Sequence, residues 1–139
     1  MSSEFIFVYG TLRKHSANPM HQVLAQNCEY LSDACMQGKL YEVRGYPGVI
    51  ESANENDKVI GEVYKVNKND SERVLSVLDT YEGCTAAFPA PHEYIRQKLP
   101  VSLAAGGTVS AWVYLFNHDV TNLQQLESGD YLTFIKPPN

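Results

Sequence analysis

The 139-residue chain lacks the basic surplus and the long apolar runs that mark several classes of protein. Its 11 Lys and Arg residues are outnumbered by 16 Asp and Glu residues, which gives a formal net charge of -5. Affinity for nucleic acids comes mostly from clustered basic residues that neutralise phosphates, so we expect no nucleic-acid partner. The N-terminal apolar run at residues 5–9 is too short for a signal-peptide core or a membrane span. We therefore expect a cytoplasmic protein with no membrane partner.

The cysteines and histidines are few, and they do not follow the spacing of a disulfide framework or of a metal site. Cys28, Cys35 and Cys84 are odd in number and include no CxxC pair, which is typical of reduced thiols. The four histidines are not paired at the close spacing of zinc ligands. We therefore expect neither a disulfide nor a bound metal.

The composition is that of an ordinary globular protein. Hydrophobic residues make up 44% of the chain and charged residues 19%. A chain of this length buries enough apolar surface to fold without metal or disulfide support. Because we find no repeat and no linker, we expect a single domain over residues 1–139. The sequence carries no indication of an oligomeric state.

Several segments have the pattern of β-strands. Residues 5–9 are apolar throughout, which predicts an interior strand that is covered on both faces and ends at Gly10. Residues 39–50 contain strand-like residues on either side of a Gly- and Pro-rich bend, which predicts a hairpin. The further predicted strands are 59–66, with one partly solvated face, and 93–103 and 108–116, joined by a Gly-Gly turn.

Two segments have the pattern of α-helices. An Asn-Pro pair at Asn18 precedes a predicted short helix. Residues 69–83 show helical spacing, and Asn69 with Glu72 resembles a capping box. The predicted buried face of this helix consists of Val74, Val77, Leu78 and Tyr81. The tail after Gly129 is expected to fray. Together the elements predict an α+β domain whose mainly antiparallel sheet curls into a small barrel.

Two places in the sequence have features typical of a binding or catalytic site. A glycine turn at Gly10 can aim successive main-chain N–H groups into one concavity that binds a carboxylate. Glu82 follows Asp79 at the end of the predicted helix, where the helix dipole disfavours acids. The dipole, the neighbouring acid and any burial would raise the pKa of Glu82 toward the range useful for proton transfer. Each place also has a plain interpretation, a chain turn for Gly10 and an exposed acid for Glu82.

Five short motifs, in this order, resemble the γ-glutamylcyclotransferase-like superfamily, which includes γ-glutamylamine cyclotransferases and the plant AIG2-like proteins. The motifs are YGTL at 9–12, GYPG at 45–48, GEVY at 61–64, LDTYEG at 78–83 and YIR at 94–96. The resemblance implies a small, mixed but mainly antiparallel β-barrel of five to seven strands with two or three flanking helices. The YGTL motif of this chain is more similar to the loop of the γ-glutamylamine branch than to the YGSN loop of another branch.

The resemblance also implies the site residues and the reaction. Tyr9, Gly10, Thr11 and Leu12 become the loop that binds the glutamyl group of a small γ-glutamyl substrate, and Glu82 becomes the catalytic acid and base. The α-amine of the substrate attacks its own γ-carbonyl, which releases 5-oxoproline and a free amine. No cofactor and no nucleophilic Ser or Cys is required. The identity of the leaving amine stays open.

Two other hypotheses stay open from the sequence. The same fold can bind a small acidic metabolite without turnover, although Glu82 would repel such a ligand. Cys84 can also act as a nucleophile with His92, although no orienting Asn or Asp is identifiable. The loop at residues 83–93 contains two prolines and can select the leaving amine. Further residues that can line the site, each with an ordinary structural interpretation, are Arg13, Tyr46 and Tyr114.

Overall fold

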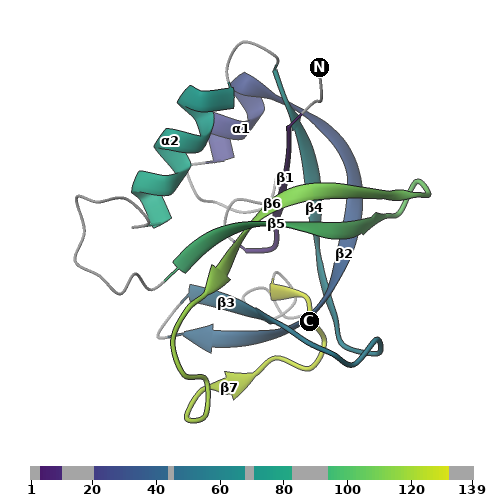
Figure 1. Ribbon diagram of the computed structural model, residues 1–139, viewed down its shortest axis with the longest axis vertical. Helices are drawn as coiled ribbons and strands as arrows, with labels where there is room; N and C mark the ends of the chain where they lie inside the picture. The colour runs from purple at the N-terminus through teal and green to yellow at the C-terminus, as the bar shows by residue number, and fades with distance from the viewer. Residues whose placement is uncertain (1–3, 11–20, 44–45, 68–70, 83–93, 132–139) are drawn as a thin grey trace, which may run out of the picture.

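The computed structural model shows two helices packed on one side of a closed β-barrel (Figure 1). The residues that it describes are 4–10, 21–43, 46–67, 71–82 and 94–131. In chain order the elements are β1 (Phe5–Val8), α1 (His21–Asn27), β2 (Cys28–Val43), β3 (Tyr46–Glu51), β4 (Lys58–Val66), α2 (Ser71–Glu82), β5 (Tyr94–Leu103), β6 (Thr108–Phe116) and β7 (Gln124–Gln125). Neither helix in these ranges is long and apolar enough to cross a bilayer.

Five strands close the barrel. They follow the order β2-β4-β1-β6-β5, and β5 pairs back onto β2 where Ala34 lies opposite Leu103. The neighbours are antiparallel except for β1 and β6, which pair in parallel at Ile6 and Trp112. Strands β3 and β7 both pair with β2 outside the closed ring. The expected α+β fold with a small, mainly antiparallel barrel is confirmed.

The barrel wall separates two clusters of buried apolar side chains. Side chains alternate along a strand, so Ile6 and Val8 face the helices while Phe7 faces the barrel interior. Ile6 and Val8 belong to the same cluster as Leu24 of α1 and Leu78 of α2. Phe7 belongs to the second cluster, which is built from the other face of the strands. Both faces of β1 are therefore covered, as its unbroken apolar run predicts.

The predicted hairpins are also present. Strands β2 and β3 pair antiparallel from Val43 and Tyr46 outward. Strands β5 and β6 pair along most of their length, and the turn between them contains Gly106 and Gly107 with φ angles of 110° and 88°. Such positive φ angles favour glycine strongly, so the Gly-Gly pair accounts for this turn.

Two burial predictions were wrong. Val77 was expected on the buried face of α2, yet 39% of its surface is exposed. Val74 and Leu78 of the predicted face are buried, Leu75 beside them is partly buried, and the side chain of Tyr81 lies outside the described part of the chain. The expected partly solvated face of β4 contains Glu62, which is only 1% exposed. Tyr64 and Val66 of β4 belong to the cluster beside the helices, and Val59 and Val63 belong to the barrel-interior cluster, so this strand is covered on both faces.

The segment after β7 packs onto the barrel and does not fray at Gly129. The carbonyl of Gly129 accepts a hydrogen bond of 2.7 Å from the backbone N–H of Ile60 in β4. Two residues after this bond, Tyr131 is 1% exposed and belongs to the barrel-interior cluster. The predicted fraying is therefore wrong up to Tyr131, and residues 132–139 lie outside the described residues.

We predict that Gly61→Ala destabilises the barrel. A Cβ on Gly61 would lie 2.3 Å from the carbonyl oxygen of Val8 and 2.7 Å from the ring of Phe7. Overpacking of this kind costs about 1–3 kcal/mol, so the free energy of unfolding, measured by urea denaturation, falls by at least that amount. Ser110→Ala, at an exposed position of β6, is the control and leaves stability nearly unchanged. Equal stabilities for the two variants would contradict the close approach of β1 and β4.

Candidate functional site

Five segments that are distant in the sequence meet on one side of the barrel. They are the end of β1, the start of β3, the start of β5, the end of β6 and the last turn of α2. In Figure 1 the ends of α2 and β6 and the starts of β3 and β5 gather on the left of the view. The side-chain contacts among these segments determine what the site can do.

Gly10 packs directly against Pro47 of the GYPG motif. A Cβ on Gly10 would lie 2.4 Å from Cγ of Pro47, which is closer than real Cβ atoms approach. The φ angle of Gly10 is not among the positive values found at Gly106, Gly107 and Gly129. Glycine is therefore required here by the close approach of Pro47 and not by a left-handed turn. The contact places Gly10 of the predicted substrate loop against β3.

Tyr94 of β5 and Phe116 of β6 contact the start of β3. The Tyr94 hydroxyl donates a hydrogen bond to the carbonyl of Pro47. The rings of Tyr94 and Phe116 meet edge to face with centroids 5.7 Å apart. A Cβ on Gly48 would lie 3.0 Å from Phe116, so β3 and β6 also approach closely. Pro47 and Gly48 of the GYPG motif are thus packed between the end of β1 and the β5–β6 pair.

Tyr114 connects the end of β1 to α2. The Tyr9 hydroxyl donates a buried hydrogen bond of 2.6 Å to the main-chain carbonyl of Tyr114. The Tyr114 hydroxyl donates a hydrogen bond of 2.7 Å to Oδ1 of Asp79. Tyr114 was predicted only as a residue that can line the site, and these bonds give it a defined structural role.

Asp79 is bound through both carboxylate oxygens. Arg96 of the YIR motif donates from Nε to Oδ1 at 2.8 Å and from a terminal nitrogen to Oδ2 at 3.1 Å. The two side chains are 19% and 23% exposed, so the pair is largely shielded from water. An acid near the end of a helix is disfavoured by the dipole, and the Arg96 guanidinium offsets that effect. No short-range sequence pattern predicts this pair, because its members are 17 residues apart in different elements.

Glu82 is the last residue of α2, one turn beyond Asp79. The structure describes its backbone, and its side chain lies outside the described part of the chain. The contacts of Asp79 therefore locate the helix turn that carries Glu82 beside β5 and β6. Other candidates outside the described residues are Thr11, Leu12, Arg13, Cys84, His92 and the side chain of Tyr46. Of the predicted substrate loop, Tyr9 and Gly10 are described, and both are buried.

The GEVY motif contributes a buried carboxylate, Glu62, that the sequence analysis did not identify as a candidate. Glu62 lies opposite Val8 of β1 and accepts a hydrogen bond of 2.9 Å from the Tyr64 hydroxyl. Burial, followed by the charge of Glu62, raises the pKa of Tyr64 above its ordinary value. The signal available in the sequence was the spacing of Glu62 and Tyr64, which are two apart and so face the same side of a strand.

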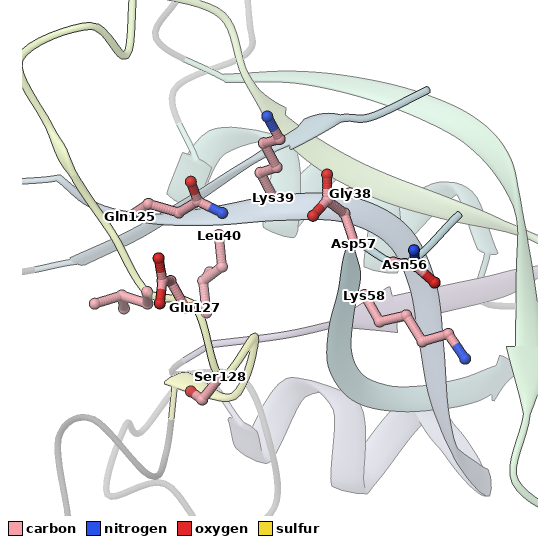
Figure 2. Close-up of a pocket in the computed structure, with 10 residues that line it drawn as sticks. Gly38, Lys39, Leu40, Asn56, Asp57, Lys58, Gln125, Glu127 and Ser128 are labelled. Atoms are coloured by element: carbon pink, nitrogen blue, oxygen red, sulfur yellow. The ribbon is translucent and has the colours of Figure 1, made fainter. Parts of the chain in front are cut away.

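A polar pocket of about 140 Å³ lies at a different place, between β2, the chain before β4 and the segment after β7 (Figure 2). Its charged side chains are two lysines and two acids, so they create no field of one sign. They are Lys39, Lys58, Asp57 and Glu127. Of the predicted site residues that the structure describes, none lines this pocket. Within the described ranges, no group of three or more His, Cys, Asp or Glu side chains could hold a metal ion.

Comparison with known proteins identifies similar sequences over almost the full chain. The family model described as Gamma-glutamyl cyclotransferase, AIG2-like matches residues 6–133. The gamma-glutamylcyclotransferase family protein YtfP of Escherichia coli K12 is 34% identical over 128 residues, which are 91% of this chain and 95% of YtfP. A protein of Methanocaldococcus jannaschii, provisionally named a gamma-glutamylcyclotransferase, is 33% identical over 132 residues, 92% of this chain and 95% of that protein.

Solved structures have the same architecture. The solution structure of Escherichia coli ytfP has a TM-score of 0.62 at 32% identity, over 95% of this chain and 99% of that one. The crystal structure of YkqA from Bacillus subtilis has a TM-score of 0.70 at 27% identity, over 99% of this chain and 44% of YkqA. A mouse AIG2-like protein has a TM-score of 0.69 at 24% identity, over 91% of this chain and 88% of that one, which shows the fold alone.

We predict that Gly10→Ala destabilises the site and that Pro47→Ala relieves the effect. The added methyl group overlaps Cγ of Pro47, which should lower the free energy of unfolding by about 1–3 kcal/mol. Pro47→Ala removes Cγ, and the nearest remaining atom of residue 47 is then Cβ at 3.6 Å, an ordinary contact. In a double-mutant cycle measured by urea denaturation, Gly10→Ala should therefore cost much less in the Pro47→Ala background. An equal cost in both backgrounds would contradict the packing of Gly10 on Pro47.

Proposed function

Because the chain belongs to the gamma-glutamyl cyclotransferase, AIG2-like family, we propose that it is an enzyme that cyclises a γ-glutamyl compound. The substrate is a γ-glutamyl amine or a γ-glutamyl amino acid, and the products are 5-oxoproline and the free amine. Glu82 is the general base and acid of this reaction. The glutamyl end of the substrate binds to the loop that begins at Tyr9 and Gly10.

The observation that carries the proposal is the connection between the end of β1 and the last turn of α2. The hydrogen bond from Tyr9 to Tyr114, and that from Tyr114 to Asp79, join the two segments. A substrate-binding loop and a proton carrier must keep a fixed relation for an intramolecular reaction, because most of its acceleration comes from positioning. These contacts supply such a relation between the loop and the helix.

The substrate contains its own nucleophile. A bond forms between the α-nitrogen and the γ-carbonyl carbon, and the bond from that carbon to the leaving nitrogen breaks. Well-oriented intramolecular reactions reach effective molarities of about 10⁵ M or more, so selecting the folded conformer is most of the catalytic task. No Ser or Cys nucleophile and no cofactor is needed for this step.

Proton transfer is the remaining task. The α-ammonium must lose a proton before it can attack, and the amide nitrogen leaves readily only when it is protonated. The α-ammonium releases one proton to water, and Glu82 accepts a second proton from the α-nitrogen and returns it to the leaving nitrogen. General acid and base catalysis of this kind contributes about 10²- to 10⁴-fold. Main-chain amides of residues 10–12 bind the α-carboxylate of the substrate.

We predict that Glu82→Gln slows turnover strongly. The purified protein is incubated with a panel of γ-glutamyl amines and γ-glutamyl amino acids, and 5-oxoproline is quantified. The wild type should release 5-oxoproline from at least one compound, and the variant should be slower by about 10²-fold or more, because glutamine cannot accept the proton.

Glu72→Gln is the matched control, since it changes an exposed acid in the first turn of the same helix. This variant should retain wild-type rates. Thiol alkylation of the wild type should also leave the rate unchanged, because the reaction uses no cysteine. If the wild type released 5-oxoproline from none of the compounds, the proposed activity would be wrong, and a non-catalytic metabolite-binding module would be favoured.

A further inference from the structure

We infer that Asp79 is the positioning residue of the site, fixing the turn of α2 that carries Glu82 relative to the substrate loop. This inference rests on the proposed function and adds a residue to its machinery. Asp79 does not contact the reacting atoms in this account. It acts through the backbone of the last helical turn, in which Glu82 follows it by three residues.

Asp79 is held to the barrel by several contacts that come from one direction. It accepts two hydrogen bonds from Arg96 of β5 and one from Tyr114 of β6. Arg96 and Tyr114 lie directly opposite each other in the β5–β6 pair, so both donors come from one face of the barrel wall. Three hydrogen bonds from two strands restrict both the position of the helix end along the barrel and its rotation about the helix axis.

Arg96 is itself restrained by its neighbours. The Arg96 guanidinium lies 4.3 Å from the centre of the Trp112 ring. The Trp112 indole N–H donates a hydrogen bond of 2.6 Å to Glu4. Stacking of this kind limits the orientations of the guanidinium before it binds a carboxylate. Arg96 is therefore a preorganised partner for Asp79.

The hydrogen bonds of Tyr114 also connect Asp79 to Tyr9 of the substrate loop. The carbonyl of Tyr114 accepts the Tyr9 hydrogen bond, and its hydroxyl donates to Asp79. Tyr9, which precedes Gly10, and Asp79, one turn before Glu82, are thus linked through a single residue, Tyr114. A displacement of about 1 Å between catalytic groups can cost about a hundredfold in rate, so this connection suits a positioning role.

A helix that needed only to be stable would not require an acid at this position. Near the end of α2 the helix dipole disfavours a negative charge, and the last turn has no basic residue of its own. The compensating charge comes from Arg96 in another element. The placement of Asp79 is therefore explained by its contacts with Arg96 and Tyr114 on the helix-facing side of the barrel wall.

The test is a set of variants assayed for kcat and KM with the best γ-glutamyl substrate. Asp79→Ala removes all three bonds, and kcat should fall by about ten- to a hundredfold while KM changes little, because the substrate loop is untouched. Asp79→Asn keeps an acceptor for Tyr114 and should recover part of kcat. Tyr114→Phe should lower kcat less than Asp79→Ala. Combined with Asp79→Ala it should add little, since the hydroxyl has already lost its acceptor.

Asp33→Ala is the matched control. Asp33 also accepts a hydrogen bond from a tyrosine, Tyr30, at 2.6 Å, but on the exposed side of β2. Its removal should leave kcat within about twofold of the wild type. Thermal unfolding of every variant shows whether it remains folded at the assay temperature. A loss of kcat in the Asp33 variant equal to that in the Asp79 variant would overturn the inference.

Hydrogen exchange provides a readout that does not depend on turnover. In Asp79→Ala the backbone amides at residues 79–82 should exchange faster than in the wild type, while those at the middle of α2 should change little. If the wild type were inactive but this local effect appeared, the positioning would stand and the proposed function would fail. If the wild type were active and neither kcat nor exchange changed in Asp79→Ala, the positioning would be wrong and the proposed function would stand.

Discussion

The two hydrogen bonds of Tyr114 are the interaction on which the rest of the candidate site depends. One ties the end of β1 to β6 through Tyr9, and the other ties α2 to β6 through Asp79. Since β1 and β6 are neighbours in the barrel, the barrel provides a rigid frame for both bonds. Tyr9 at the end of β1 and Asp79 in the last turn of α2 are thus both attached to Tyr114.

Much of the fold could be predicted, because the patterns of apolar residues and glycines are clear. The unbroken run at β1 follows from cover on both faces, and Gly106 and Gly107 account for the β5–β6 turn. The first half of β2 gave no such signal. A bulge between Tyr30 and Ser32 interrupts its alternation, and its buried positions include small side chains such as Ser32 and Ala34.

The candidate site was predictable only in part. Short motifs pointed to Gly10 and Glu82, and they identified Asp79 as a second acid in an unfavourable turn. The reason for Asp79 is a guanidinium 17 residues later, and no local pattern reports such a contact. Similarly, the reason for glycine at position 10 is Pro47, which reaches it only through the closure of the fold. Local patterns reveal which residues break a rule, and the tertiary structure shows what compensates each one.

In the proposed reaction the carboxyl group of Glu82, the last residue of α2, transfers a proton to and from the α-nitrogen of a substrate that is bound at the end of β1. A crystal structure of the protein with the product 5-oxoproline tests this claim most directly. We expect the ring nitrogen within about 3 Å of a Glu82 carboxylate oxygen, and the product carboxylate on the amides after Tyr9. A bound product whose nitrogen is remote from Glu82, or one that occupies another part of the barrel, would contradict the account.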